Sequence, residues 1–197
     1  MKDNETKDNE TREKRTKGGT VREVISFVLY IGVVFVLTFL VIRYVGQRTE
    51  VSGSSMENTL SNGDNLIVDK ISYRFRDPER FDIIVFPYQH GADTYYIKRI
   101  IGLPGETVRI DANGIIYING EELVESYGRE VISPDKLGLA ENEITLGDDE
   151  YFVLGDNRNA SSDSRDPSVG NVHREDIIGR AWLRIYPFNK IGFIRHK

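Results

Sequence analysis

The chain has 197 residues, of which 39% are hydrophobic and 29% are charged, and it carries a net charge of −5. This acidic balance argues against a nucleic-acid-binding protein, because contacts with phosphates need a basic face. The chain contains no cysteine, which excludes disulfides, a thiol nucleophile, thiolate zinc sites and lipidated cysteines. Length and composition predict a globular protein with one main body.

The amino-terminal part of the chain changes sharply in character. Residues 1–22 are polar and charged without periodicity, which predicts a disordered tail. An uncharged apolar run follows from Val24 to Ile42, and as a helix it would be roughly 28 Å long, close to the hydrocarbon thickness of a bilayer. A buried soluble helix and a cleaved signal peptide are the alternatives. Large apolar side chains on all sides and the lack of a small-x-small site favour an uncleaved transmembrane anchor over residues 23–45.

The charges that flank the apolar run predict its orientation. Arg43 and Arg48 follow the run, whereas six basic residues precede it: Lys7, Arg12, Lys14, Arg15, Lys17 and Arg22. Because basic loops stay in the cytoplasm, we expect a cytoplasmic N-terminus, one pass through the cell membrane and an extracytoplasmic body over residues 46–197. Twelve residues separate Arg43 from Ser55 and span at most about 40 Å, so Ser55 should lie near the outer membrane surface.

The body alternates short apolar segments with turn signals, a layout typical of antiparallel β structure. We predict an all-β fold of antiparallel sheets, barrel-like, with a small hairpin extension at residues 112–123. Helix is limited to a turn or two, at 134–140 or 174–177. The predicted strands are rich in β-branched and aromatic residues: 65–69, 81–86, 95–101, 107–110, 115–118, 151–154 and 178–186.

A serine in the segment SGSSMENTL, residues 52–60, is the first candidate for chemistry. A serine nucleophile needs a base, because its free hydroxyl reacts poorly at neutral pH. The three histidines, His90, His173 and His196, lie in polar, loop-like segments, and we expect surface positions, with His173 kept as an alternative base. A lysine base therefore suits Ser55 better.

Lys98 in YYIKRIIGLPGE, residues 95–106, is the favoured lysine, and Lys70 is its rival. A lysine base must be uncharged, which requires apolar surroundings. On a strand, Tyr96 and Ile100 share the face of Lys98, whereas Arg99 points to the other face.

A third segment, GDNRNASSDSR at residues 155–165, combines tight-turn residues with two aspartates and two arginines. A free carboxylate beside Lys98 would favour the charged amine. We therefore expect Asp156 and Asp163 to be engaged by Arg99, Arg158 or Arg165.

These three segments, in this order behind one anchor, closely resemble bacterial type I signal peptidases (leader peptidases), in their short Gram-positive form. The resemblance implies that Ser55 is the nucleophile and Lys98 the general base. It places Ser161 where the family keeps a hydroxyl that orients the lysine. It also places four residues on structural and ion-pairing positions: Gly155, Asp156, Asp163 and Arg165.

The resemblance further implies a membrane-bound serine endopeptidase that cleaves exported preproteins after an Ala-x-Ala-like sequence, without metal or cofactor. The segment from Val51 to Ser55 and the strand before Lys98 would bind the substrate as an added strand. Shallow pockets for small side chains would be shaped by Leu66, Ile84 and Ile97. The expected partners are exported preproteins and the lipid bilayer, with no nucleic acid.

The sequence departs from the family pattern at two positions. Gly53 stands where some members carry a serine that donates to the oxyanion, which leaves the backbone N–H of Ser55 and either Ser52 or Ser54 for that role. Asn58 stands in place of the usual proline before Thr-Leu.

Other functions stay open at this point. A non-catalytic membrane-anchored β-domain that binds exported chains is one alternative. A self-cleaving Ser-Lys regulator of the repressor type is another, although the anchor and the lack of a DNA-binding module argue against it. Three aromatic residues are interpreted as core residues, with lipid contact as the alternative: Trp182, Phe188 and Phe193.

Overall fold

The structure is a computed structural model that describes residues 22–40, 46–89, 91 and 94–196. The chain forms two compact units, residues 1–44 and 45–197, and each is described by itself. The predicted tail, apart from Arg22, lies outside the described residues, as do positions 41–45 of the predicted anchor.

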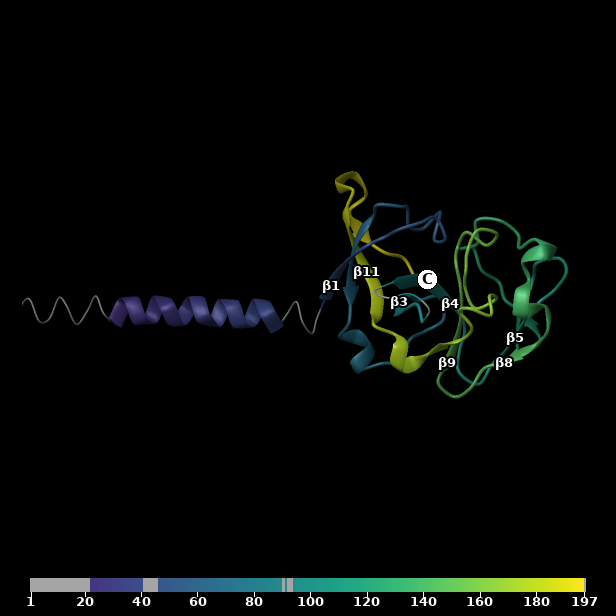
Figure 1. Cartoon of the computed structure of the whole chain (residues 1–197), viewed down its shortest axis with the longest axis horizontal. Coiled ribbons are helices and arrows are strands. Elements are labelled where there is room, and N and C mark those ends of the chain that lie inside the picture. Colours follow the sequence, from purple (N-terminus) through teal and green to yellow (C-terminus); the bar gives the residue numbers. More distant parts are fainter. Residues whose placement is uncertain (1–21, 41–45, 90, 92–93, 197) are drawn as a thin grey trace, which may run out of the picture. The chain divides into compact units, whose positions relative to one another are not determined.

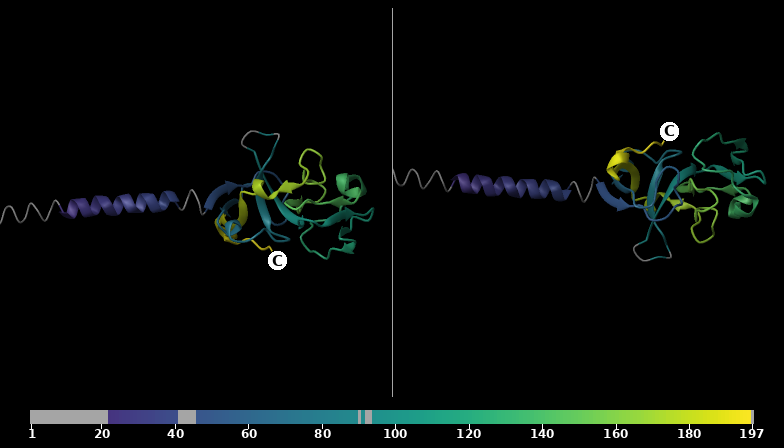
Figure 2. Two further views of the ribbon diagram at one scale, coloured as in Figure 1. Left: turned by 90° about the horizontal axis from the view of Figure 1, so that it is seen from below. Right: turned by 90° about the horizontal axis from the view of Figure 1, so that it is seen from above.

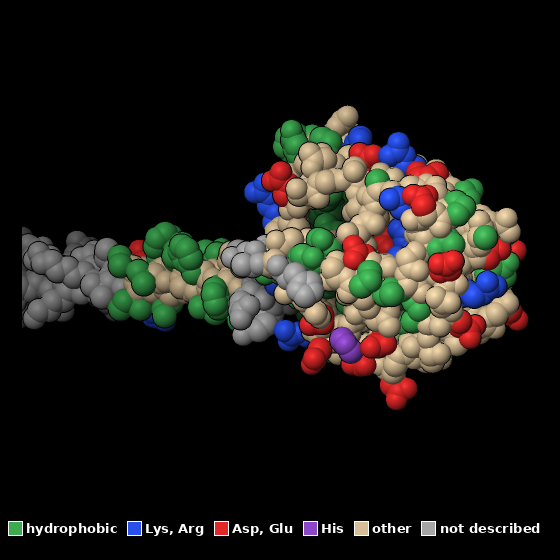
Figure 3. Space-filling model, turned by 45° about the vertical axis from the view of Figure 1, so that its right-hand side comes forward, with side chains coloured by type: hydrophobic (Ala, Val, Ile, Leu, Met, Phe, Trp, Pro, Cys, Tyr) green, Lys and Arg blue, Asp and Glu red, His purple; other side chains and the backbone are tan. Residues whose placement is uncertain are grey.

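The first unit holds one described helix, Arg22–Leu40, which is long and apolar enough to cross a membrane. Its side chains are exposed, and hydrophobic groups cover the face of the helix seen in Figure 3. An exposed apolar surface of this kind is what an anchor presents to lipid.

The second unit is built on a large antiparallel sheet with the strand order β1-β2-β11-β3-β4-β9-β10, and β12 pairs with β11 (Figure 1). Strand β11 pairs with both β2 and β3, so it joins the β1–β2 pair to the β3–β4 pair. The strands of this sheet are β1 (Gly46–Glu50), β2 (Asn65–Asp69), β3 (Ile83–Pro87), β4 (Tyr95–Gly102), β9 (Glu150–Leu154), β10 (Val172–His173), β11 (Gly179–Tyr186) and β12 (Gly192–Phe193).

A smaller sheet with the order β7-β6-β5-β8 lies at the opposite end of this unit from β1 and β11 (Figure 2). It contains the predicted hairpin extension. Its strands are β5 (Thr107–Ile110), β6 (Ile116–Ile118), β7 (Glu121–Glu122) and β8 (Ile144–Thr145). The short 3-10 helices of the unit are η2 (Ser72–Arg74), η3 (Pro134–Lys136), η4 (Gly138–Glu141), η5 (Arg174–Asp176) and η6 (Phe188–Lys190).

The predicted all-β class is confirmed, and each predicted strand overlaps an observed one. The pairing of the large sheet ends at β1 and β10, so the described strands form no closed barrel. Strand β1 was not predicted, because its sequence GQRTE contains no apolar residue. The two-residue strands β8, β10 and β12 were not predicted either, because segments this short leave no alternation to detect.

Three buried clusters hold the second unit together. Ile101 of β4 and Phe152 of β9 join the cluster of the small sheet, and they fix that sheet to the larger one. Val51 and Leu66 belong to a second cluster, and Ile84 to a third. The clusters place β4, which carries Lys98, in the middle of the packed unit.

Two residues near the end of the described chain, Ile194 and His196, are buried in the second unit. Ile194 donates its backbone N–H to the carbonyl of Trp182, and Nδ1 of His196 accepts the N–H of Ile83 at 3.0 Å. His196 is only 6% exposed, so the expected surface position was wrong. Its polar neighbours in sequence gave no sign of this burial, which depends on strands far away in the chain.

Candidate active site

Ser55 and Lys98 lie together, although 43 positions separate them in the sequence. The Nζ atom of Lys98 is 2.9 Å from Oγ of Ser55, within hydrogen-bond distance, and it donates to the carbonyl of Ile97 at 3.1 Å. Ser55 lies in the turn after β1, and Lys98 lies on β4. This contact is the geometry that a serine nucleophile and its base require.

The environment of Lys98 disfavours its charge. The residue is 3% exposed. Burial lowers the pKa of the Lys98 amine from 10.5 to about 8, against the opposing attraction of Asp163 and Asp156. A substantial fraction of the amine is therefore uncharged in mildly alkaline solution.

Aromatic and apolar groups form the wall around this amine. The ring centroid of Tyr96 is 4.8 Å from Nζ of Lys98, and Tyr96 stacks on Tyr88 with centroids 4.7 Å apart. Ile100 is fully buried in the cluster against which Tyr96 packs. The face that the strand periodicity predicted for Tyr96 and Ile100 agrees with this arrangement.

The two aspartates are engaged by arginines, as expected. Arg99, on the other face of β4, holds Asp156 with two hydrogen bonds of 2.8 and 2.7 Å, and both side chains are fully buried. The hydroxyl of Thr59 donates to Asp156 at 2.5 Å, and the ring of Tyr127 lies 3.8 Å from the guanidinium of Arg99. Asp156 is therefore compensated within its own network.

Asp163 forms a second buried pair, with Arg165. Nε and Nη2 of Arg165 donate to its two carboxylate oxygens at 2.8 Å each, and the backbone N–H of Gly155 adds a bond of 3.0 Å. Arg165 also donates to the carbonyl of Arg158 at 2.6 Å. The pair thus fixes both ends of the loop 155–165.

Arg158 has a different partner from those expected. Its Nη1 is 2.7 Å from Oε1 of Glu125, and both side chains are nearly buried. Glu125 belongs to the stretch after β7 in which the sequence showed no motif. A single glutamate in a loop carries no signal of its own, so only the fold reveals this partner.

The nucleophile turn is tied to the loop 155–165 by its backbone. Asn157 donates its backbone N–H to the carbonyl of Ser55 at 3.0 Å and its side-chain amide to the carbonyl of Ser54 at 3.1 Å. Gly53 has a φ of +96°, which favours glycine and accounts for the absence of a serine there. Ser52 and Ser54 are exposed.

Gly155 is the point of closest approach between the two segments. A Cβ there would lie 2.5 Å from the carbonyl oxygen of Ser55 and 2.3 Å from Oγ of Ser161. The Ser161 hydroxyl is buried without a hydrogen-bond partner among the described residues, and no hydrogen bond joins it to Lys98. The structure places Ser161 against the dyad segment, and its role as the group that orients Lys98 stays a prediction.

A cleft of about 440 Å³ opens over the dyad. One wall consists of the residues from Thr49 to Met56, and the other consists of the residues from Thr94 to Lys98, with Ala160 and Ser162 completing the lining. The predicted residues Val51 and Ile97 lie in these two walls.

Two other predicted substrate-binding residues lie deeper. Leu66 and Ile84 are fully buried and do not line the cleft. Leu66 packs in the same cluster as Val51 and Ile97 and supports those two side chains from the core. The family resemblance implied pocket positions for both residues, and their apolar character did not tell a pocket wall from the core beneath it.

The alternative bases lie outside this cleft. His173 is on β10, exposed, with Nδ1 3.3 Å from Asp149, whose hydrogen bond raises the pKa of the imidazole. Neither His173 nor Lys70 lines the cleft, and His90 lies outside the described residues. No group of three His, Asp or Glu side chains in the described part of the chain is arranged to hold a metal ion.

Comparisons with known proteins identify the family of the chain. Residues 24–186 match the family model "Signal peptidase, peptidase S26". A probable signal peptidase I-2 of Synechocystis is 42% identical over 77% of this chain and 68% of its own length, and a signal peptidase I of Leptolyngbya laminosa is 40% identical over 82% and 79%. Signal peptidase I P of Bacillus subtilis subsp. natto is 34% identical over 85% and 92%.

Among solved structures, the chain is similar to a signal peptidase I from Enterococcus faecalis V583. The two are 36% identical with a TM-score of 0.44, over 53% of this chain and 97% of that one. The family match extends over more than half of the chain, and its members are serine proteases that cleave signal peptides from preproteins. The chain belongs to the signal peptidase S26 family.

Proposed function

We propose that this protein is a membrane-anchored serine endopeptidase that uses Ser55 as nucleophile and Lys98 as general base to remove signal peptides. The observation that carries the proposal is the contact of 2.9 Å between the Ser55 hydroxyl and a buried amine. A surface lysine would be permanently charged and unable to accept a proton at neutral pH.

The reaction proceeds in two steps, acylation of Ser55 and hydrolysis of the acyl-enzyme. The hydroxyl oxygen of Ser55 attacks the scissile carbonyl carbon, and its proton passes to Nζ of Lys98. Lys98 then protonates the leaving amine as the C–N bond breaks, which leaves an acyl-enzyme. A water molecule, deprotonated by the same amine, attacks the carbonyl carbon of this ester. Lys98 then returns the proton to Oγ of Ser55 as the ester bond breaks, and the acid product gives its remaining proton to solvent and leaves as a carboxylate.

The backbone N–H of Ser55 is the first candidate donor to the oxyanion. It donates to no acceptor among the described residues. The bond from Asn157 to the carbonyl of Ser55 holds this part of the turn in place. A fixed donor at the attacked oxygen stabilises the charge that develops there. Ser52 or Ser54 would supply the second donor.

The substrate would bind as an extended strand between the two walls of the cleft. Strand β4 pairs with β3 along Tyr95 to Arg99, but with β9 only from Arg99 onward. Its edge over the preceding residues is therefore unpaired among the described strands. Ile100 bonds to Phe81 and Asp82 on the β3 side, so Ile97 presents its backbone groups to the cleft. An extended preprotein segment could add to this edge.

Cleavage after an Ala-x-Ala-like sequence and an extracytoplasmic location of the body complete the proposal. The first rests on the family resemblance, and the second on the excess of basic residues before the apolar helix. The exposure of three aromatic side chains supports contact between the body and lipid. Phe188 is 78% exposed, Phe193 70% and Trp182 42%, so the interpretation of these three as core residues was wrong. Tryptophan is enriched at membrane interfaces, and exposed phenylalanines add apolar surface that lipid can cover.

Alanine substitutions test the dyad. Ser55→Ala and Lys98→Ala should each reduce cleavage of a labelled preprotein to background, because each removes a group that takes part in bond making or proton transfer. The matched control is Thr145→Ala, which removes an exposed hydroxyl outside the catalytic cleft and should keep activity within about threefold. Sequencing the new N-terminus of the product locates the cut. Normal cleavage by either dyad variant would refute the proposal.

A further inference from the structure

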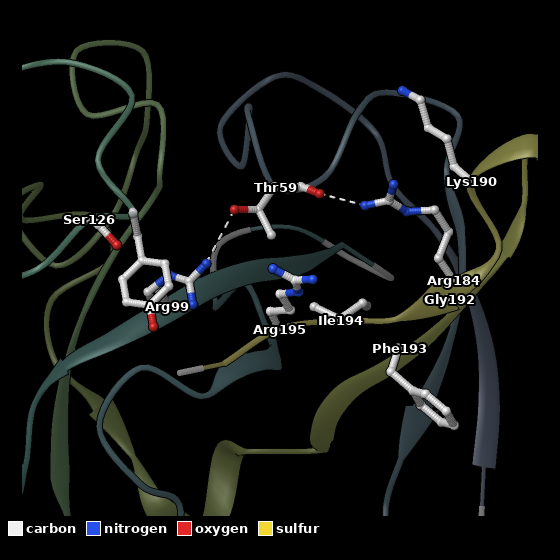
Figure 4. Close-up of a pocket in the computed structure, with 10 residues that line it drawn as sticks. Thr59, Arg99, Ser126, Arg184, Lys190, Gly192, Phe193, Ile194 and Arg195 are labelled. Carbon is white, nitrogen blue, oxygen red and sulfur yellow. Dashed lines mark hydrogen bonds between the residues drawn. The ribbon is translucent and has the colours of Figure 1, made fainter.

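A second pocket, of about 470 Å³, shares no lining residue with the catalytic cleft. Four of its ten lining residues are cations, Arg99, Arg184, Lys190 and Arg195, and none is a carboxylate. In Figure 4, Arg195 lies between Arg99 and Arg184, and Lys190 stands above Arg184. The chain as a whole has 31 acidic and 26 basic residues, so this pocket reverses the overall balance of charge.

Two of the four cations are held in fixed positions. Arg99 is locked by Asp156, and Arg184 lies 3.0 Å from Asp64. Thr59 links the two arginines: its hydroxyl accepts from Arg99 at 3.2 Å, and its carbonyl accepts from Arg184 (Figure 4). Side chains that are already ordered lose little entropy when a ligand binds.

The other two cations lack compensation. Among the described residues, the side chains of Lys190 and Arg195 form no ion pair and no hydrogen bond; Lys190 bonds only through its backbone N–H, to the carbonyl of Pro187. Like charges gathered in a concave site raise its positive potential, because the low-dielectric walls focus the field. Ser126 and Tyr127 add side-chain hydroxyls to the lining. The pocket therefore offers several donors and an uncompensated positive charge to a ligand.

We propose that this pocket binds a phosphate-bearing anion. Guanidinium groups match the geometry of phosphate oxygens, and a phosphate brings up to two negative charges and three acceptor oxygens. The volume is in the range of small-molecule sites, so it admits a phosphate that carries an organic substituent. Such a group comes either from a free phosphate compound or from a phospholipid headgroup. Phe193, which lines the pocket and is 70% exposed, gives the site an apolar side suited to the second source.

The single tryptophan of the chain provides the readout. The ring centroid of Trp182 is 5.5 Å from that of Phe193. We expect inorganic phosphate, titrated into the full chain in detergent micelles at constant ionic strength, to change the Trp182 emission saturably. Because phosphate replaces chloride at constant ionic strength, the general screening of charges stays unchanged during the titration. Calorimetric titration under the same conditions gives an independent affinity.

A second arm distinguishes the sources. The full chain is placed in nanodiscs of phosphatidylcholine alone or of phosphatidylcholine with phosphatidylglycerol, and Trp182 emission is compared. A difference between the two compositions that free phosphate does not reproduce identifies the headgroup as the ligand. Saturation by free phosphate, with equal emission in both nanodiscs, identifies a soluble phosphate compound.

Two double variants decide whether the pocket is responsible. Lys190→Gln with Arg195→Gln should weaken the response about tenfold or more, because two charge-assisted contacts are lost. The control, Arg109→Gln with Lys136→Gln, removes the same charge from exposed positions elsewhere and should bind like the parent.

Equal responses of the two double variants, or no saturable response in either arm, would overturn the proposal. The experiment measures binding, and the four substituted residues of the two double variants lie outside the catalytic cleft. The outcome is therefore independent of the proposed peptidase activity.

Discussion

Lys98 combines two properties that a general base needs, contact with the nucleophile and a weakened positive charge. Its pKa of about 8 predicts how the rate depends on pH. Below this value kcat/KM for a soluble signal-peptide substrate should rise about tenfold per pH unit, because only the uncharged amine accepts a proton, and it should level off above it. Stopped assays between pH 6 and pH 10 would measure this. A plateau already reached by pH 7 would indicate a different base, such as an imidazole.

Burial of the Lys98 amine also destabilises the folded protein. In the folded protein the amine has a pKa of about 8, against 10.5 in the unfolded chain, so at neutral pH folding must bury a charged group. Lys98→Met should therefore raise the free energy of unfolding at pH 7 by about 1–3 kcal/mol while abolishing cleavage.

The gain from Lys98→Met should shrink as the pH rises from 8 toward 10.5, because the folded parent then loses its proton and no longer buries a charge, whereas the unfolded chain keeps its proton. Urea denaturation at pH 7 and pH 10 tests the sign. A loss of stability at both values would show that the amine is well solvated.

Individual residues were predictable from the sequence where their chemistry restricts the choice. Ser55 and Lys98 follow from the need for a base and from the lack of a well-placed histidine. Leu66 and His196 show the limit, because their exposure depends on distant strands. An apolar residue on a strand reads the same whether it lines a cleft or lies beneath it.

The loop 155–165 acts on the nucleophile turn through close backbone contact. Gly155→Ala would place a Cβ 2.5 Å from the carbonyl oxygen of Ser55, and one of the two segments must move. A small displacement of a nucleophile is costly, so we expect kcat/KM to fall about tenfold or more. The control is Gly192→Ala, where no neighbouring atom lies within 4 Å of the added carbon. Unchanged activity of Gly155→Ala would show that this contact does not position the dyad.

At the level of elements, the strands were predictable because alternation and turn residues mark them. The loop after β7 was not predictable, although three of its residues contact charged residues of the site. Glu125 pairs with Arg158, Tyr127 covers Arg99, and Arg129 donates its backbone N–H to the carbonyl of Asp156. Each contact comes from one residue of an irregular loop, so no spacing in the sequence reports it.

The second unit has its own core. All three buried clusters consist of residues between 51 and 194. A fragment of residues 46–197 should therefore unfold cooperatively and cleave a soluble peptide with a kcat/KM within about threefold of the full chain.

The same fragment should process a membrane-embedded preprotein at least tenfold more slowly, because it lacks the tether that raises the local concentration. Thermal circular dichroism and parallel assays on the two substrates test this. An unfolded fragment would show that the core needs the amino-terminal segment.

The position of β11 also constrains when activity can arise during synthesis. Ser55 lies in the turn between β1 and β2, and Lys98 lies on β4 of the β3–β4 pair. Among the described strands, only β11 connects the two pairs within the sheet. Ribosomes make this connecting strand, residues 179–186, late. Until it emerges, a nascent chain holds the two halves of the dyad on unlinked hairpins. We therefore expect newly made molecules to lack an assembled dyad until residues 179–186 are available for folding.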